Sequence, residues 1–207
     1  MAFMDTEANV LAIETTTGAC SVALAAKGHW LEDTRIAPRL HNRYLLAMVD
    51  GLLKVASLDR RALQVIAFGA GPGSFTGVRI GAAVAQGIAL GAGARVLQVA
   101  SSAVAAESLR RSTPRRGGVS LSRTSRSGWS YVARYELLDH GVRCLEFDEL
   151  VQDGDVDQCV VDGARCAMSA RVVGELALTN LASAGEPATA VPLYVEGDSP
   201  WRPTEPG

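Results

Sequence analysis

"GAGPGSFTGVRIG", Gly69 to Gly81, places five glycines and a proline between an apolar run and a segment with helical spacing. The run Leu63 to Ala70, which overlaps the first two residues of this stretch, is largely apolar and is ended by glycine, which is typical of a buried parallel strand. The segment after it predicts a helix from about Thr76 to Leu90. A strand, a loop and a helix in this order indicate an α/β fold, in which the glycine loop either cradles a phosphate or allows close packing.

The loop lacks residues that two familiar phosphate-binding motifs require. A Walker A loop has a lysine after its last glycine, and no lysine lies between Gly69 and Gly81. A Rossmann loop has a glycine three residues after Gly71, where this chain has Ser74. With these two motifs excluded, only a general anion-binding property is left. Ser74 or Thr76 can cap the following helix, whose N-terminal amides can hold an anion.

The predicted helix is rich in small residues at four-residue spacing, among them Gly77, Gly81 and Ala85, and Gly87 and Gly91 follow. Each internal glycine costs about 1 kcal/mol relative to alanine. Tight packing against another element would offset that cost. The sequence leaves open whether the packing lies within the chain or across a subunit interface.

The elements around this unit follow the order of a ribonuclease-H-like half-domain, the unit that actins and sugar kinases build in duplicate. An antiparallel meander is predicted first, and apolar steps of three and four residues then predict an amphipathic helix. A further strand and helix come after the glycine helix. The predicted strands are Val10–Ile13, Ser21–Ala26, Trp30–Ile36 and Arg95–Ala100, and the predicted helices are Leu40–Ala56 and Ser101–Arg111.

The second half of the chain has weaker signals. After a loop at about 112–118, strands are predicted within 119–138 and 142–147, and a late helix within 166–184. We therefore expect three parts: residues 1–100 as the first lobe, 101–195 as a smaller second lobe, and 196–207 as a flexible tail with three prolines.

Composition indicates a globular protein that we expect in the cytoplasm. The chain has 207 residues, of which 48% are hydrophobic and 20% charged. No apolar stretch free of charge and glycine reaches the roughly 18 residues of a membrane span, and the N-terminus has acids where a secretory signal has lysines. Cys20, Cys144, Cys159 and Cys166 lack paired spacing, which favours neither a disulfide framework nor a zinc site.

The formal net charge is −2, but the charges are unevenly placed. No acid lies between Glu107 and Glu136, where several arginines gather. This basic stretch is either a solvated loop or a surface that contacts tRNA phosphates directly. Its arginines are Arg110, Arg111, Arg115, Arg116, Arg123, Arg126 and Arg134.

Four segments carry a family resemblance: "LAIETTTGACSVAL", "GPGSFTGVRIG", "AQGIALG" and "PLYVEGDSPW". With them the chain resembles the bacterial tRNA threonylcarbamoyladenosine biosynthesis family TsaB, also called YeaZ, closely over about 9–110 and loosely beyond. The resemblance implies an actin-like ASKHA fold with two ribonuclease-H-like lobes, the second reduced. Where the family commonly has Asp-Ala-Arg, this chain has Thr124, Ser125 and Arg126.

The resemblance also implies a role without catalysis. TsaB supports and activates its paralogue TsaD, which transfers a threonylcarbamoyl group to an adenosine of tRNA, and the ATPase TsaE joins the complex. The chain would meet tRNA through that complex, and it could also form a homodimer through the same surface. The expected partner interface lies on the amphipathic helix and the glycine helix: Leu45, Met48, Leu52, Gly77, Arg79, Ile80, Gly81 and Val84.

The alternative is an ASKHA-type ATPase or phosphotransferase. Actin-like ATPases have an aspartate in the first hairpin, where this chain has Glu14 followed by three threonines. Weak adenine nucleotide binding would use Glu14, Thr15, Thr16, Gly71, Gly73 and Ser74, within the Glu14–Thr17 hairpin and the Gly71–Thr76 loop. We predict no metal site and no catalytic set, since the paired histidines of the catalytic relative are reduced here to His41, with Leu45 four residues on.

Overall fold

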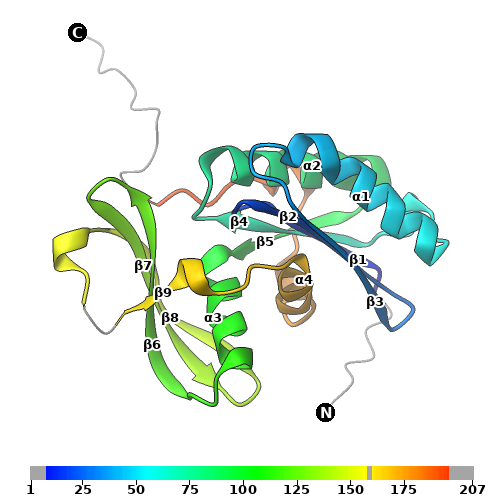
Figure 1. The fold of residues 1–207 in the computed structure, drawn as a ribbon. Helices are drawn as coiled ribbons and strands as arrows, with labels where there is room; N and C mark the ends of the chain where they lie inside the picture. Colours follow the sequence, from blue (N-terminus) through cyan, green and yellow to red (C-terminus); the bar gives the residue numbers. More distant parts are fainter. Residues whose placement is uncertain (1–7, 158–159, 196–207) are drawn as a thin grey trace, which may run out of the picture.

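The computed structural model describes residues 8–157 and 160–195, which form two sheets and four α-helices (Figure 1). The first sheet has the order β3-β2-β1-β4-β5. Its strands are β1 (Val10–Glu14), β2 (Ala19–Ala26), β3 (His29–Ile36), β4 (Val65–Gly71) and β5 (Arg95–Ala100). The first three form the predicted antiparallel meander, β4 runs parallel to β1, and β5 runs parallel to β4.

The second sheet repeats this arrangement with one strand fewer. Its order is β8-β7-β6-β9, with β6 (Gly117–Arg126), β7 (Trp129–Leu138), β8 (Gly141–Gln152) and the short β9 (Val161–Asp162). Three antiparallel strands are again followed by one that is parallel to the first of them. The expected fold, actin-like with two ribonuclease-H-like units and the second reduced, is confirmed.

The helices cover the sheets as Figure 1 shows. Two of them, α1 (His41–Ala56) and α2 (Phe75–Ala92), lie on one face of the first sheet. The third, α3 (Ser101–Ser112), packs against β7 and β8 of the second sheet. The fourth, α4 (Ala170–Leu178), follows the second sheet in sequence but covers the other face of the first, against β1, β2 and β4. The division of the chain into lobes at residue 100 stays a prediction.

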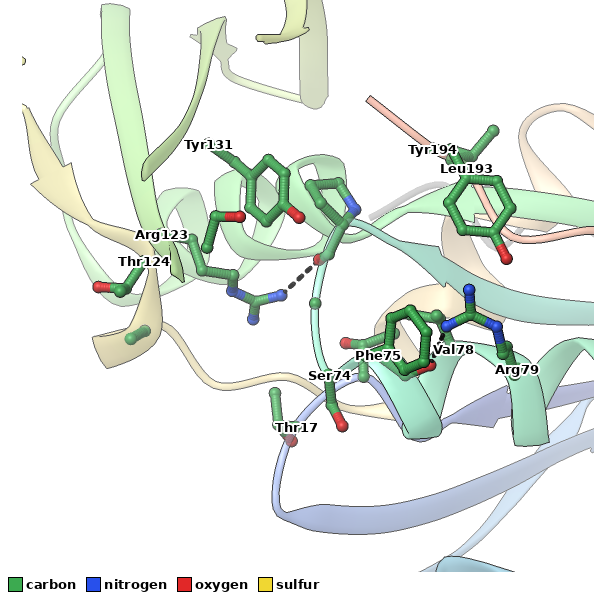
Figure 2. A pocket seen from close by; sticks show the side chains of 15 residues that line it. Thr17, Ser74, Phe75, Val78, Arg79, Arg123, Thr124, Tyr131, Leu193 and Tyr194 are labelled. Carbon is green, nitrogen blue, oxygen red and sulfur yellow. Dashed lines mark hydrogen bonds between the residues drawn. The ribbon is translucent and has the colours of Figure 1, made fainter. Parts of the chain in front are cut away.

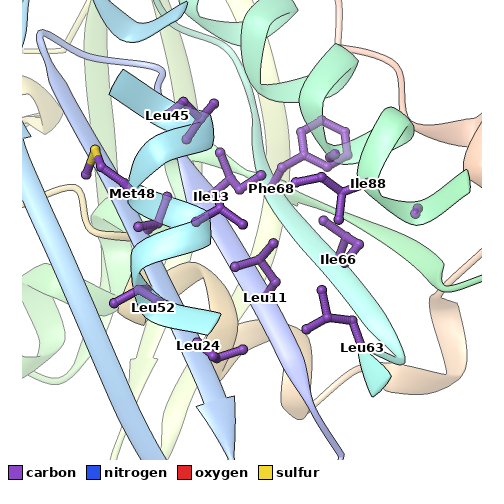
Figure 3. Packing of buried hydrophobic residues seen from close by; sticks show 14 of the residues in the cluster. Leu11, Ile13, Leu24, Leu45, Met48, Leu52, Leu63, Ile66, Phe68 and Ile88 are labelled. Atoms are coloured by element: carbon purple, nitrogen blue, oxygen red, sulfur yellow. The ribbon is translucent and has the colours of Figure 1, made fainter. Parts of the chain in front are cut away.

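The core of the first sheet explains its apolar strands. On one face, α1 and α2 bury side chains against alternate strand residues such as Leu11, Ile13 and Phe68 (Figure 3). On the other face, the intervening residues, including Ala12 and Ala67, pack against α4. Because both faces are covered, β4 is apolar throughout and β1 is apolar up to Glu14, instead of alternating.

The bounds of some elements differ from the sequence-based prediction. The late helix is shorter than the expected 166–184, since α4 begins at Ala170, after the Ser169 side chain caps Val172 N, and ends at Leu178. The loop expected at 112–118 is also shorter, because β6 begins at Gly117. The tail at 196–207 and Cys159 lie outside the described residues.

Helix α2 is capped at both ends, and its N-cap is Ser74, one of the two predicted caps. Ser74 Oγ accepts a hydrogen bond from Gly77 N at 3.3 Å, and the C-cap Gly93, which follows Ala92, has a φ of 69°. By length and composition alone this helix could cross a membrane, with a mean hydropathy of 1.3. One of its faces, however, packs on the first sheet, as the core helix of a globular domain does.

Candidate functional site

A cleft of about 480 Å³ lies where the two sheets face each other (Figure 2). The β1–β2 hairpin, the glycine loop and the first turns of α2 form one wall. The opposite wall comes from β6 and β7, and the segment before residue 195 closes one side. The lining residues are Thr16, Thr17, Pro72, Gly73, Ser74, Phe75, Val78, Arg79, Arg123, Thr124, Ser125, Tyr131, Ala164, Leu193 and Tyr194.

The glycines of α2 let the helix touch the β1–β2 hairpin. A Cβ atom at Gly77 would lie 2.0 Å from the Thr15 carbonyl oxygen, and one at Gly81 would lie 2.7 Å from Thr15 Oγ1. Thr15 Oγ1 also donates a hydrogen bond to the Gly77 carbonyl oxygen at 2.8 Å. The sequence left open whether these glycines pack within the chain or across a subunit interface. The structure shows that Gly77 and Gly81 pack within the chain.

Glu14 is turned into its own hairpin and not into the cleft. Its Oε1 accepts hydrogen bonds from Thr16 N at 2.6 Å and from Thr16 Oγ1 at 2.5 Å. Its Oε2 is buried without a hydrogen-bond partner among the described residues and occupies the space that a Cβ at Gly69 would need. Burial raises the pKa of Glu14, against the lowering effect of the hydrogen bonds from Thr16.

The structure divides the six predicted nucleotide-binding residues into two groups. Thr16, Gly73 and Ser74 line the cleft. Glu14, Thr15 and Gly71 are buried behind the lining, where Gly71 adopts a φ of 106° that favours glycine. The second group therefore shapes the loop, and of the six residues only the first group lines the cleft. Nucleotide binding by these residues stays a prediction.

Two arginines of the cleft were not expected to face each other across it. Arg79, predicted as an interface residue, lies between the rings of Phe75 and Tyr194, 3.4 Å and 5.3 Å from their centroids (Figure 2). Arg123, from the basic stretch, donates a hydrogen bond to the Pro72 carbonyl oxygen at 2.9 Å. The motif around Tyr194 was visible in sequence, but its approach to Arg79 joins residues more than a hundred positions apart.

The predicted interface residues also fall into two groups. Five of them, Leu45, Met48, Leu52, Gly77 and Gly81, are buried within the chain, as Figure 3 shows for the three on α1. The sequence pattern identified the inner face of the helices, which packs on the sheet. Arg79, Ile80 and Val84 retain exposed area.

A different set of residues forms the outer face of these two helices, which we call the helical surface. The helices α1 and α2 contact each other, and many of their outward side chains are small or apolar, with the polar Asn42, Arg43, Asp50 and Lys54 among them on α1. The helical surface consists of Leu46, Ala47, Gly51 and Val55 on α1 and of Ile80, Ala83, Val84, Gly87, Leu90 and Gly91 on α2.

Each arginine of the basic stretch makes a contact within the chain, and four of the seven pair with a carboxylate. Arg110 and Arg111 bind the buried Glu107. The other contacts are Arg115 to the Gly118 carbonyl oxygen, Arg116 to Asp139, Arg123 to the Pro72 carbonyl oxygen, Arg126 over the Trp129 ring and Arg134 to Glu146. Direct contact with tRNA through this stretch stays a prediction. It would require each arginine to contact a phosphate in addition to its partner within the chain.

His41 has a structural contact at the start of α1. Its ring is buried, and Nε2 lies 3.2 Å from the Ala19 carbonyl oxygen. Within 8–157 and 160–195, no three His, Cys, Asp or Glu side chains are grouped as a metal site would need. The cysteines in that part of the chain, Cys20, Cys144 and Cys166, are free thiols.

A polar network lies behind the cleft, at the start of α3. Asp148 Oδ2 accepts a hydrogen bond from Ser102 Oγ at 2.5 Å, and Ser102 Oγ lies 2.9 Å from the Tyr135 hydroxyl. Burial raises the pKa of Asp148 to about 6, although the Ser102 hydrogen bond and the charge of Arg123 lower it. The folded state therefore binds a proton more readily here than the unfolded chain does.

We expect Asp148→Asn to become more stabilising, relative to the wild type, as the pH rises from 4 to 7. The folded-state pKa of Asp148 lies above its ordinary value of 3.8, so the wild type loses stability as this group ionises between those values. The full difference is at most about 3 kcal/mol. Urea unfolding at several pH values measures it, with the exposed Asp139→Asn as the control that should show no such trend. A pH-independent difference for Asp148→Asn would contradict the assignment.

The chain matches a family model described as TsaD: tRNA N6-adenosine threonylcarbamoyltransferase, over residues 34–183. It is similar to the tRNA threonylcarbamoyladenosine biosynthesis protein TsaB of Haemophilus influenzae, with 44% identity over 92 residues, which are 44% of this chain and 39% of that protein. The corresponding Escherichia coli K12 protein is 47% identical over 83 residues, 40% of this chain and 36% of that protein. The chain thus spans less than half the length of these curated relatives.

Two solved structures from Pseudomonas aeruginosa match nearly the whole fold. One is described as an uncharacterized protein with similarity to peptidase YEAZ, with a TM-score of 0.80 and 30% identity, covering 91% of this chain and 99% of that one. The other, YeaZ, has a TM-score of 0.79 and 27% identity, covering 91% of this chain and 100% of that one.

Proposed function

Because this chain belongs to the TsaB/YeaZ family, we propose that it takes part in the biosynthesis of threonylcarbamoyladenosine in tRNA, as a non-catalytic scaffold subunit. In this role it supports the transferase TsaD in the cytoplasm, together with the ATPase TsaE. It meets tRNA through the complex. Since the curated relatives are matched over less than half of their length, the whole role is part of the proposal.

The observation that carries the proposal is the helical surface. Leu46, Val55 and Leu90 are 55%, 71% and 67% exposed on two adjacent helices. Gly87 has open space where a Cβ would be, as do Gly51 and Gly91. Apolar side chains separated by glycines leave grooves into which the side chains of a partner helix fit.

The hairpin supports the scaffold proposal over the ATPase alternative. Binding of a magnesium nucleotide generally places a carboxylate or its water near the cation. Glu14 uses one oxygen for Thr16 and holds the other against Gly69. Turning Glu14 outward would break two hydrogen bonds, so the hairpin in this conformation favours a structural part for it.

The first test is the modification of an ANN-decoding tRNA by purified TsaD and TsaE of the same organism. We expect the rate of threonylcarbamoylation to fall at least tenfold when this chain is omitted, while the chain alone hydrolyses no ATP. Equal modification without the chain would exclude the scaffold role. ATP hydrolysis that disappears in Glu14→Ala would favour the enzymatic alternative instead.

The helical surface is tested by Gly87→Arg. A long charged side chain on the outer face of α2 should weaken TsaD binding at least tenfold, because it occupies space that the partner helix would use. It should change the free energy of unfolding by less than about 1 kcal/mol, since a Cβ at this position would meet no atom of another element within 4 Å. Analytical ultracentrifugation of the mixture, and of the chain alone for the homodimer, measures the binding.

The matched control is Gly154→Arg, at a second-lobe position that is equally open and has no positive φ. It should bind TsaD as the wild type does. If Gly87→Arg binds normally and Gly154→Arg does not, the partner surface lies on the second lobe.

A further inference from the structure

A separate group of arginines lies where β3 leads into α1, which we call the β3–α1 corner. Arg35 stands near the end of β3, Arg39 in the connecting turn and Arg43 in the first turn of α1. All three are exposed, and the sequence has no acid between Asp33 and Asp50. The corner is therefore a local excess of positive charge in a chain whose formal net charge is −2.

Most of this charge has no counterpart within the chain. Arg35 pairs with Asp33 at 3.2 Å, whereas Arg39 and Arg43 form no ion pair with any residue of 8–157 and 160–195. The basic stretch differs, because four of its seven arginines pair with a carboxylate. The corner thus offers guanidinium groups that an anionic partner can bind without first breaking an ion pair.

The backbone of the corner is fixed to the neighbouring β1–β2 hairpin. Ala37 N donates a hydrogen bond to the Gly18 carbonyl oxygen at 3.0 Å, and Leu40 N donates to the Ala37 carbonyl oxygen at 3.0 Å. His41 Nε2 lies 3.2 Å from the Ala19 carbonyl oxygen. The arginines therefore project from a turn that is held in place on both of its sides.

One aromatic ring gathers two of the three guanidinium groups. The guanidinium carbons of Arg35 and Arg43 lie 5.5 Å and 5.8 Å from the centroid of the Tyr44 ring. Attraction to the ring keeps the two groups near each other in spite of their like charge. Arginines that are arranged in advance lose less conformational entropy when they bind a partner.

The start of α1 carries charges of the sign that the helix dipole disfavours. The N-terminal end of a helix is partly positive and is commonly balanced by an acid or capped by a polar side chain. Here the N-cap is Leu40, whose side chain makes no cap hydrogen bond, and the first turn contains no acid. Arg39 and Arg43 add further positive charge at this end. A bound phosphate would be attracted by the helix end and by both guanidinium groups.

From this arrangement we propose that the β3–α1 corner binds the phosphate backbone of RNA, with Arg39 and Arg43 each contacting a phosphate. Arginine side chains and helix N-termini are among the groups that proteins use for such contacts. An acidic protein segment would meet the same charges. RNA is favoured because the proposed function brings tRNA to this chain, and in naming tRNA the inference rests on that function.

The test is a titration of a fluorescently labelled ANN-decoding tRNA with the purified full chain, followed by anisotropy at several salt concentrations. We expect saturable binding that weakens steeply as salt rises. The double variant Arg39→Asn/Arg43→Gln should bind at least tenfold more weakly and lower the salt slope by about 2, one unit for each lost phosphate contact. Asparagine is chosen at position 39 because it tolerates the φ of 65° found there.

The matched control is Arg61→Gln/Arg165→Gln, which removes the same charge from two exposed positions outside the corner. It should change the affinity for tRNA less than twofold. Thermal unfolding checks that both double variants fold, and analytical ultracentrifugation should show that the corner variant still binds TsaD. Unchanged tRNA affinity in the corner variant would overturn the proposal, as would an equal loss in the control, which would indicate net charge alone.

Two further outcomes separate this inference from its competitors. If the corner variant loses TsaD binding and keeps its tRNA affinity, the corner contacts an acidic protein surface and the RNA assignment is wrong. If tRNA is modified equally without this chain while the corner variant has lost tRNA binding, the scaffold role fails and the inference stands.

Discussion

Gly77→Ala is expected to destabilise the folded chain by more than about 4 kcal/mol. The new Cβ would lie 2.0 Å from the Thr15 carbonyl oxygen, which is backbone and cannot turn away. Either α2 or the β1–β2 hairpin has to move, although α2 packs on the buried β4 and the β1 strand of the hairpin pairs with β4. Urea unfolding followed by circular dichroism measures the loss.

A graded series on the same helix shows whether the contact itself is responsible. Gly81→Ala should lose about 1–3 kcal/mol, because its Cβ would meet the Thr15 hydroxyl at 2.7 Å and a side chain can rotate. Gly87→Ala should gain about 0.5–1 kcal/mol, since it meets nothing and alanine favours the helix. Equal effects at the three positions would mean that helix propensity, and not contact with the hairpin, determines the change in the free energy of unfolding.

Glu107→Gln is expected to cost about 3 kcal/mol, the second large effect. Glu107 is 3% exposed and accepts hydrogen bonds from Arg110 and Arg111. Arg111 also pairs with Glu175 on α4 at 2.5 Å, so this network ties the helix of the second sheet to the helix beneath the first. Replacing the charged acid leaves two guanidinium groups with a weaker acceptor in a partly buried site.

The pH dependence of the free energy of unfolding is a second test of this prediction. Burial by itself would raise the pKa of Glu107, but the hydrogen bonds from Arg110 and Arg111 outweigh it and lower the pKa below its ordinary value of 4.5. The stabilisation is therefore complete above pH 4.5 and is lost as the pH falls further. We expect the difference between the wild type and Glu107→Gln to shrink in that range.

The matched control is Glu146→Gln, which removes an exposed pair with Arg134. Its effect on the free energy of unfolding should stay below about 1 kcal/mol, because water screens an exposed pair. A loss as large as that of Glu107→Gln would show that burial is not what makes the Glu107 network strong.

The sequence predicted the elements of the first sheet because their signals are local. Apolar steps of three and four residues indicated α1, an apolar run ended by glycine indicated β4, and Ser74 or Thr76 indicated the start of α2, where the structure has Ser74 as the cap. Periodicity and capping depend on residues a few positions apart, so they can be read without knowing the fold. The weaker second half was predicted in kind, while α4 proved shorter than expected.

The same local patterns could not show which face of a helix packs on the sheet of its own chain and which face is open to a partner. Leu45, Met48 and Leu52 were predicted to contact a partner, yet they pack on the sheet of their own chain. A spacing of three and four residues shows that a helix has an apolar face, and it does not show what covers that face. The position of the sheet decides this, and it leaves Gly87 and Leu90 outward.

The cleft depended most on the tertiary structure. Composition, periodicity and motifs determined an α/β chain and identified the glycine loop, and the TsaB resemblance implied the two ribonuclease-H-like units that the sheets then showed. Only the folded chain places Arg123 against Pro72, Tyr194 against Arg79 and α4 beneath the first sheet. These contacts join residues about fifty to more than a hundred positions apart, so they depend on strand order and on how the two sheets face each other, which no local sequence pattern records.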